Sequence, residues 1–233
     1  MNHSAARGRY NLNMAPAIQA HLIGFGSTGE RPAYCNLSFT VPIGGALGIY
    51  GESGTGKTLL QRALAGEVAP THGHLKIFGF DSTTSVVRAR CAFVPSSHVT
   101  GFSSRLTGLE NLIYHGSRAG VTARQVTEIA ERWLFELGMG EALRTPVELC
   151  STGMLRALAV TRAFVADPHL VVLDEPFSGL SERASARLEA LLLARRRSQT
   201  LVVGSASKFH ACRLATQVLD LNRRLTVVEH ALP

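Results

Sequence analysis

One eight-residue stretch constrains the fold of this chain more than any other: Gly51, Glu52, Ser53, Gly54, Thr55, Gly56, Lys57 and Thr58. It fits the pattern G-x-x-x-x-G-K-[ST] and lies between a short apolar run, Ala46 to Tyr50, and a helical pattern from about Lys57 to Ala65. Glycines let such a loop fold tightly, with its N–H groups turned inward onto phosphate oxygens. The helix that follows adds its positive dipole end. The stretch therefore predicts a strand–loop–helix unit that binds the phosphates of a nucleotide.

Two side chains at the end of this loop would carry most of its chemistry. Lys57 would place a point charge on the β- and γ-phosphates, and the Thr58 hydroxyl would bind Mg²⁺. A glycine-rich turn with an accidental lysine is the alternative interpretation. The strand and helix patterns on either side of the loop argue against it.

Two acidic residues, Asp174 and Glu175, follow the apolar run Leu170 to Leu173. A continuous apolar run is typical of a buried parallel strand, and ligand sites lie at the carboxyl ends of such strands. Asp174 would hold Mg²⁺ directly or through water, and Glu175 would orient and deprotonate an attacking water. A helix N-cap region would also explain acids after a strand. Together with the phosphate loop, the pair favours a catalytic role.

Strand and helix patterns alternate along the chain, which predicts an α/β fold with a mostly parallel sheet and helices on both faces. The strand patterns cover Leu37 to Val41, Ala46 to Tyr50, Leu75 to Phe78, Ala92 to Val94, Leu170 to Leu173 and Leu201 to Val203. Between about 109 and 149 the apolar spacing is helical instead, which predicts a helical insertion into that core.

The length of 233 residues and the 45% hydrophobic content fit a single domain with a substantial core. We expect an N-terminal tail over 1–20 and one domain over 21–233. Its core would comprise 21–95 and 157–233, and its helical subdomain about 96–156.

The composition limits the classes of protein to which this chain could belong. No uninterrupted apolar stretch of about 18 residues occurs, and the N-terminus has no apolar block with a cleavage site, so we expect neither a membrane span nor a signal peptide. The four cysteines match no zinc pattern and are typical of a reduced cytoplasmic protein. A net charge of +7 could favour binding to nucleic acid or anionic lipid, but the basic residues are scattered along the sequence. Their one cluster, 195–197, is typical of a solvated helix end.

Further motifs follow the phosphate loop in a fixed order. Leu106 to Leu112 reads L-T-G-L-E-N-L, Ser151 to Arg156 reads S-T-G-M-L-R, and D-E-P at 174–176 precedes S-G-L at 178–180. In this order and spacing, the motifs resemble those of the ATP-binding subunits of ABC transporters, over about Leu22 to Leu221. The S-T-G-M form resembles exporter-type members most. This resemblance implies a P-loop NTPase core, a mostly parallel sheet, an antiparallel β portion near the N-terminus and an inserted helical subdomain.

The resemblance also implies cofactors and partners. ATP and Mg²⁺ would be bound, and two ATP-binding subunits would pair head to tail as a homo- or heterodimer. The signature residues would then act on the ATP of the other subunit: Ser151, Thr152, Gly153 and Met154. An ordinary helix cap is the alternative interpretation of these four residues. A membrane permease on another polypeptide would be the partner, at the cytoplasmic face of the cell membrane, and no nucleic acid is expected.

Four positions depart from the pattern of this family. Ser96 stands where a glutamine that reaches Mg²⁺ is usual, Ser181 where aspartate is usual, and Ala206 where a histidine donates to the γ-phosphate. His210, one helical turn further on, could compensate for that missing histidine. The aromatic residue that stacks on adenine is not evident; Phe25 is the candidate, with a core role as the alternative.

These departures spare the charged groups that bind magnesium–ATP and weaken those that sense the γ-phosphate. Loss of one donor to a transition state typically costs about 2.7–4 kcal/mol. We therefore predict an ATPase that binds ATP well and hydrolyses it slowly, or only with its partner. Two other interpretations stay open: a soluble ABC ATPase acting on nucleic acid or ribosomes, and a non-catalytic nucleotide-sensing subunit.

Overall fold

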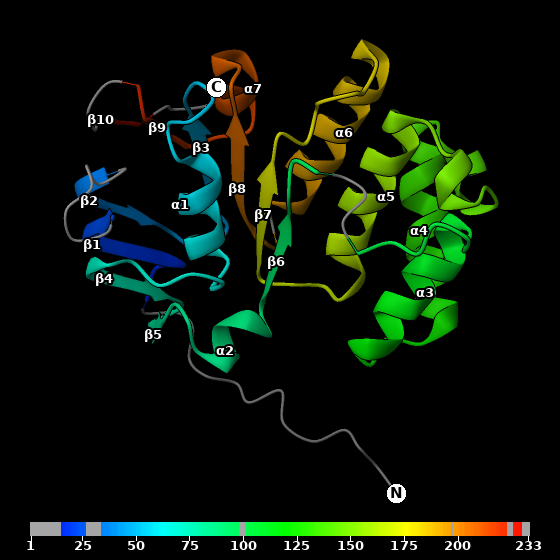
Figure 1. The fold of residues 1–233 in the computed structure, drawn as a ribbon, viewed down its shortest axis with the longest axis horizontal. Coiled ribbons are helices and arrows are strands. Elements are labelled where there is room, and N and C mark those ends of the chain that lie inside the picture. Colours follow the sequence, from blue (N-terminus) through cyan, green and yellow to red (C-terminus); the bar gives the residue numbers. More distant parts are fainter. Residues whose placement is uncertain (1–14, 27–33, 98–100, 197, 223–225, 230–233) are drawn as a thin grey trace, which may run out of the picture.

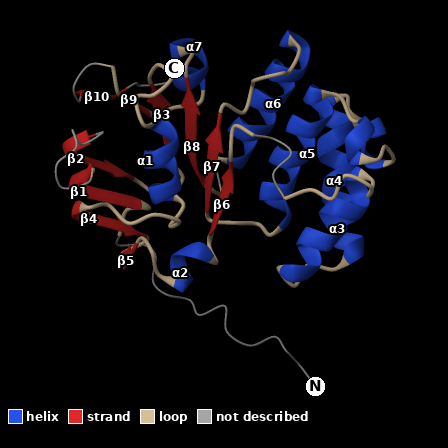
Figure 2. Cartoon of the chain, in the orientation of Figure 1, coloured by secondary structure: helices blue, strands red, loops and turns tan. Residues whose placement is uncertain are grey.

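The computed structural model describes residues 15–26, 34–97, 101–196, 198–222 and 226–229. These residues form two sheets and a set of helices (Figures 1 and 2). The strands are β1 Ile18–Phe25, β2 Tyr34–Val41, β3 Ala46–Tyr50, β4 His72–Ile77, β5 Phe80–Asp81, β6 Cys91–Val94, β7 Leu170–Asp174, β8 Thr200–Ser205, β9 Gln217–Asp220 and β10 Thr226–Glu229. The helices are α1 Lys57–Leu64, α2 Ser85–Arg88, α3 Gly108–Arg118, α4 Ala123–Leu137, α5 Thr152–Val165, α6 Glu182–Arg195 and α7 Lys208–Arg213, with 3-10 turns η2 Gly140–Leu143 and η3 Val147–Leu149.

The larger sheet has the strand order β10-β9-β3-β8-β7-β6. Neighbouring strands from β9 to β6 pair in parallel, and β10 joins the edge antiparallel to β9. All residues of β7 and β8 are buried, as expected for central strands covered on both faces. The prediction of a mostly parallel sheet is therefore confirmed.

A smaller antiparallel sheet, β2-β1-β4-β5, forms the expected antiparallel portion. Its first strand begins at Ile18, which pairs with Val41 on one side and Ile77 on the other. Ile18 and Ala20 are buried while Gln19 between them is exposed, the alternation of a strand with one face on a core. Residues 18–20 thus belong to this sheet and not to the predicted tail, a correction to the boundary drawn at 20; residues 1–14 lie outside the described part of the chain.

The alternation of side chains along β7 divides the interior into two cores. Leu170 and Val172 join a cluster with Leu60 of α1 and the apolar residues of the antiparallel sheet. Val171 and Leu173 join a second cluster on the opposite face, with the apolar residues of α4, α5 and α6. Helices α1 and α5 therefore cover opposite faces of the parallel sheet.

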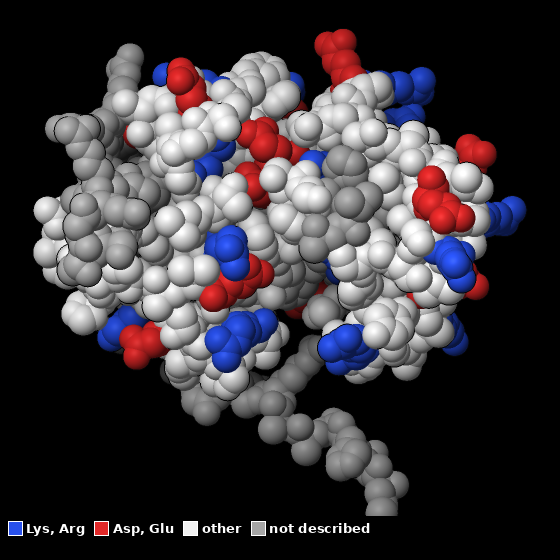
Figure 3. All heavy atoms as spheres, in the orientation of Figure 1, with Lys and Arg blue, Asp and Glu red and all other residues white. Residues whose placement is uncertain are grey.

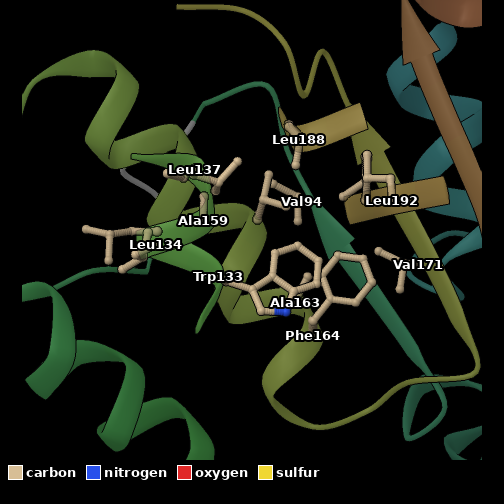
Figure 4. Close-up of a cluster of buried hydrophobic side chains, with 14 of the residues drawn as sticks. Val94, Trp133, Leu134, Leu137, Ala159, Ala163, Phe164, Val171, Leu188 and Leu192 are labelled. Carbon is tan, nitrogen blue, oxygen red and sulfur yellow. The ribbon is translucent and has the colours of Figure 1, made fainter. Parts of the chain in front are cut away.

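The second core contains the apolar faces of the helical segment. Figure 4 shows Trp133 of α4 and Phe164 of α5 beside Val171, and the two rings stack with centroids 4.4 Å apart. Capping boxes at Thr107 and Thr122 begin α3 and α4, and Gly138 ends α4 in the left-handed conformation. Helices α3 and α4 lie within the range predicted for the helical subdomain, and α5 runs across the predicted end of that range at 156 and also contacts β6 and β7.

The surface carries charges of both signs. On the face drawn in Figure 3, Lys and Arg side chains are interspersed with Asp and Glu, in agreement with their scatter along the sequence. Among the helices that the structure describes, none combines the length and the apolar character needed to cross a membrane.

Candidate functional site

The phosphate loop, residues 51–58, joins β3 to α1 at the carboxyl edge of the parallel sheet. Gly54 and Gly56 have φ angles of 83° and 86°, which glycine adopts without steric cost. At Gly51, a β-carbon would lie 2.6 Å from Thr55 Oγ1, so the loop leaves no room for a side chain there. These glycines allow the tight turn that was predicted from the sequence.

Lys57 lies inside this loop and is only 8% exposed. Its ammonium group donates to the carbonyl oxygens of Gly51 and Glu52, the latter at 2.9 Å. The N–H of Glu52 is in turn held by Asn222 Oδ1 at 3.0 Å. An ammonium group has three donors and no fixed direction, so phosphate oxygens could replace these carbonyls without any movement of the helix.

Thr58 and Asp174 meet between α1 and the end of β7. The Thr58 hydroxyl donates to Asp174 Oδ2 at 2.8 Å, and Asp174 is 1% exposed. Burial raises the pKa of Asp174; the neighbouring charge of Glu175 adds to this, while hydrogen bonds from Thr58 and Ser96 and the charge of Lys57 oppose it. A hydroxyl and a carboxylate side by side are the oxygen ligands that Mg²⁺ prefers, so these residues fit a magnesium ion.

Glu175 is held by the end of β8. Its carboxylate accepts from the Ser205 hydroxyl at 2.9 Å and from the N–H of Ala206, and its own N–H donates to Gly204 O at 2.9 Å. Its φ is 49°, an unusual conformation for a residue other than glycine and one that often occurs at functional sites. The structure thus brings Glu175 next to Asp174 in one fixed orientation.

Sequence reasoning missed Ser205. Its hydroxyl orients Glu175, and its carbonyl accepts from the N–H of Gly51 at 3.4 Å, so it contacts both halves of the site. The available signal was its position directly after the apolar run of β8, the place where a parallel strand presents ligands.

The structure shows which contacts are made by the residues that depart from the family pattern and by His210. Ser96 follows β6, whose last residue pairs with Leu173, and its side chain lowers the pKa of Asp174 as a hydrogen-bonding neighbour. Ser181 caps α6 by accepting from the N–H of Ala184 at 3.3 Å. His210 packs on Phe177, with ring centroids 4.8 Å apart. This packing gives His210 a structural role, so its compensation for the histidine missing at 206 stays a prediction.

The signature residues begin α5. The Ser151 side chain accepts from the N–H of Met154 at 3.3 Å, and both Ser151 and Thr152 are exposed. A β-carbon on Gly153 would lie 3.3 Å from the carbonyl oxygen of Gly179, so this close approach favours glycine. The helix cap and the anion site are therefore compatible: the cap occupies one N–H, and the exposed start of α5 remains open to a ligand.

The phosphate loop and the signature lie on helices that cover opposite faces of the parallel sheet, as the two cores show (Figure 1). The structure does not bring these two sets of residues together within the chain.

Phe25 does not fit the role proposed for it. Its ring belongs to the core beneath the antiparallel sheet and is 3% exposed. A ring that stacks on adenine needs an open face, so the burial of Phe25 favours the core role that was the alternative.

Comparison with known proteins now identifies the family. Residues 34–178, more than half of the chain, match the family model described as ABC transporter. This chain belongs to that family. The matched range includes the phosphate loop, the signature and the Asp174–Glu175 pair. Members of the family are ATPases, so the chain is an ATP-binding and ATP-hydrolysing subunit of the ABC type.

Three proteins similar to this chain are each described as an ATP-binding protein. The chain is 30% identical over 209 residues to the Nod factor export ATP-binding protein I of Bradyrhizobium diazoefficiens, covering 87% of this chain and 67% of that protein. It is 30% identical over 173 residues to the ABC transporter ATP-binding protein NatA of Bacillus subtilis, covering 73% and 70%. It is also 30% identical over 198 residues to the daunorubicin/doxorubicin resistance ATP-binding protein DrrA of Streptomyces peucetius, covering 83% of this chain and 57% of that protein.

Proposed function

We propose that this chain binds magnesium–ATP on residues 51–58 together with Asp174 and Glu175, and powers export through a separate membrane permease. The observation that carries the proposal is the convergence of Thr58, Asp174 and Glu175 beside the loop that holds Lys57. Export is suggested by the names of the relatives from Bradyrhizobium and Rhizobium. The protein would act as a peripheral subunit at the cytoplasmic face of the cell membrane.

Binding would depend on groups that are already in place. Inward N–H groups of the loop, the start of α1 and the ammonium of Lys57 would hold the phosphate oxygens. Thr58 and Asp174 would hold Mg²⁺, which, when bound, neutralises the charge of the β- and γ-phosphates. Because Thr58 and Asp174 are already hydrogen-bonded at 2.8 Å, little rearrangement is needed to present both oxygens.

Hydrolysis would depend on Glu175. Its carboxylate would accept the proton of the attacking water, and Ser205 and the N–H of Ala206 would hold it in orientation. Ala206 has no side-chain donor for the γ-phosphate. We therefore propose slow turnover by the isolated chain.

A second subunit would complete the site. The start of α5, with Ser151 and Gly153, would bind the γ-phosphate held by the partner in a head-to-tail dimer. The exposed cap of α5 and its place on the other face of the sheet from α1 support this arrangement.

ATP hydrolysis by the purified chain tests the proposal. We expect slow turnover in the wild type and an increase of up to about 10²–10³-fold in Ala206→His, the range that one transition-state donor typically supplies. Ala206→Ser is the matched control, because it changes the same position without adding an imidazole. Fast turnover by the wild type that Ala206→His leaves unchanged would contradict the proposal.

Comparing the wild type with Glu175→Gln tests the role of Glu175 separately. A rate that falls to background in Glu175→Gln supports its role as the general base, and equal rates in both proteins would contradict that role.

A further inference from the structure

Arg156 is a charged residue inside the protein. It lies in α5, between the signature and the middle of the helix, and it is 1% exposed. Taking a guanidinium out of water costs several kcal/mol, at order of magnitude, unless other groups compensate. Replacing a buried charged group by an apolar one of similar size is often neutral or stabilising. Packing alone therefore gives no reason for an arginine at this position.

The contacts of Arg156 point out of its own helix. One Nη donates to Pro95 O at 3.1 Å and the other to Ser96 O at 2.5 Å. Pro95 and Ser96 are the first residues after β6, which pairs with β7 in parallel. Arg156 thus fixes the main chain where β6 ends, at the same edge of the sheet as Asp174.

The loop that Arg156 fixes lies beside the candidate magnesium site. Val94 at the end of β6 pairs with Leu173, so the residues that follow it lie beside Asp174 at the end of β7. The Ser96 side chain lowers the pKa of Asp174 as a hydrogen-bonding neighbour, and the Thr58 hydroxyl donates to Asp174. Burial lowers the pKa of Arg156, while the charges of Asp174 and Glu175 raise it, so the two carboxylates favour its cationic form. Arg156 therefore ties the signature helix to the loop after β6, which lies beside Asp174.

We propose that Arg156 is a positioning residue for the magnesium–nucleotide site, which holds the Ser96 loop so that the Ser96 hydroxyl lies beside Asp174. It acts through Ser96 and touches neither nucleotide nor metal itself. The inference rests on the proposed function, since it assigns Asp174 to Mg²⁺. It also explains how a serine can take the place of the longer glutamine that is usual here: the loop itself is held close to the carboxylate of Asp174.

The experiment measures how much Mg²⁺ strengthens ATP binding. The affinity for ATP is determined by calorimetry with Mg²⁺ and with a chelator, and the melting temperature by a thermal scan. The proteins are the wild type, Arg156→Met, Arg156→Lys, Ser96→Ala and the double variant Arg156→Met/Ser96→Ala. Arg162→Met is the control, because Arg162 lies in the same helix and stacks on Phe102, with its guanidinium 4.5 Å from the ring centroid.

We expect Arg156→Met to lower magnesium–ATP affinity by about 10- to 100-fold, the usual effect of losing a residue that orients a metal ligand. Binding of metal-free ATP, which depends on the phosphate loop, should change little. Arg156→Lys keeps the charge but not the forked donors, so it should lie between the wild type and Arg156→Met. The double variant should be no weaker than Arg156→Met, because both changes act through one hydroxyl. Arg162→Met should keep the full strengthening of ATP binding by Mg²⁺, which we call the magnesium effect.

The inference is overturned if Arg156→Met lowers only the melting temperature and keeps the magnesium effect. Additive losses in the double variant would also overturn it. If Arg156→Met does not fold, Arg156→Lys decides, and a magnesium effect equal to that of the wild type contradicts the inference. Failure of the wild type to bind magnesium–ATP would instead contradict the proposed function, so the two failures are distinguishable.

Discussion

At the scale of single residues, the site combines groups that are close in sequence with groups that are far apart. Glu175 adjoins Asp174, but Ser205, the residue that orients it, lies 30 positions further along the chain. A general base is less efficient when its orientation toward the attacking water is not fixed. Ser205 is therefore the neighbour whose removal tests how Glu175 works.

Ser205→Ala should lower kcat by about tenfold with little change in KM, because misplacing a catalytic group costs rate rather than substrate binding. Steady-state ATPase kinetics measure the two parameters separately. Ser205→Thr keeps the hydroxyl and should retain most of the rate. A rise in KM at constant kcat would contradict the role of Ser205 in orienting Glu175.

Asp174→Asn should raise the melting temperature of the nucleotide-free protein at neutral pH. Folding raises the pKa of Asp174 through burial, so its charged form costs stability as pH rises above the ordinary aspartate value, and the cost is complete above the raised pKa. Asparagine removes that charge and still accepts from Thr58. Thermal scans with a chelator should therefore show a gain over the wild type that disappears under acidic conditions.

The same substitution should abolish the strengthening of ATP binding by Mg²⁺, because an amide oxygen carries no charge for the metal. A lower melting temperature at neutral pH would contradict the stated cost of the buried carboxylate. Unchanged magnesium–ATP affinity would contradict the assignment of Asp174.

The residues of the site differ in how far the sequence could predict them. The phosphate loop and the Asp174–Glu175 pair were predictable because each is a short pattern beside a strand. Arg156 was not, because it contacts Ser96, 60 positions away, and such contacts depend on the folded sheet. Phe25 was misjudged for the same reason: the sequence gives an aromatic residue but not the core around it.

At the scale of elements, capping residues and apolar runs determine where most helices and strands begin. The capping residues Thr107 and Thr122 begin their helices where the sequence pattern changes, and Ala46–Tyr50 is a strand over the predicted range. The strand order β10-β9-β3-β8-β7-β6 could not be predicted from single segments, since it depends on pairings between distant parts of the chain. Ile18 was placed in a tail although both of its partner strands were predicted, because its pairing with those distant segments does not follow from any one of them alone.

Ser181→Ala should lower the free energy of unfolding by about 1 kcal/mol, because Ser181 caps the 14-residue helix α6. Denaturant unfolding measures the loss. Ser181→Asp, which restores the usual family residue, should keep wild-type stability, because aspartate is an equally good cap. Equal losses in both variants would show that the hydroxyl is not acting as a cap.

At the scale of the whole molecule, the parallel sheet separates the phosphate loop from the signature. Helix α1 belongs to one core and α5 to the other, so the two helix starts proposed to bind phosphate lie on different faces of the sheet. Arg156 joins the α5 side to the loop after β6, which lies beside Asp174. This arrangement supports a subunit that offers its loop to one ATP and its signature to another.

The decisive experiment is a calorimetric titration of the purified chain with ATP in the presence of Mg²⁺, with Lys57→Ala beside the wild type. In the proposed site, Lys57 would contribute charge-assisted hydrogen bonds to the phosphates of about 1.5–3 kcal/mol, and each 1.4 kcal/mol corresponds to a tenfold change in affinity. We predict saturable binding by the wild type and an affinity at least about tenfold weaker in Lys57→Ala. No binding by the wild type, or equal affinity in both proteins, would contradict the assignment of the ATP site to residues 51–58.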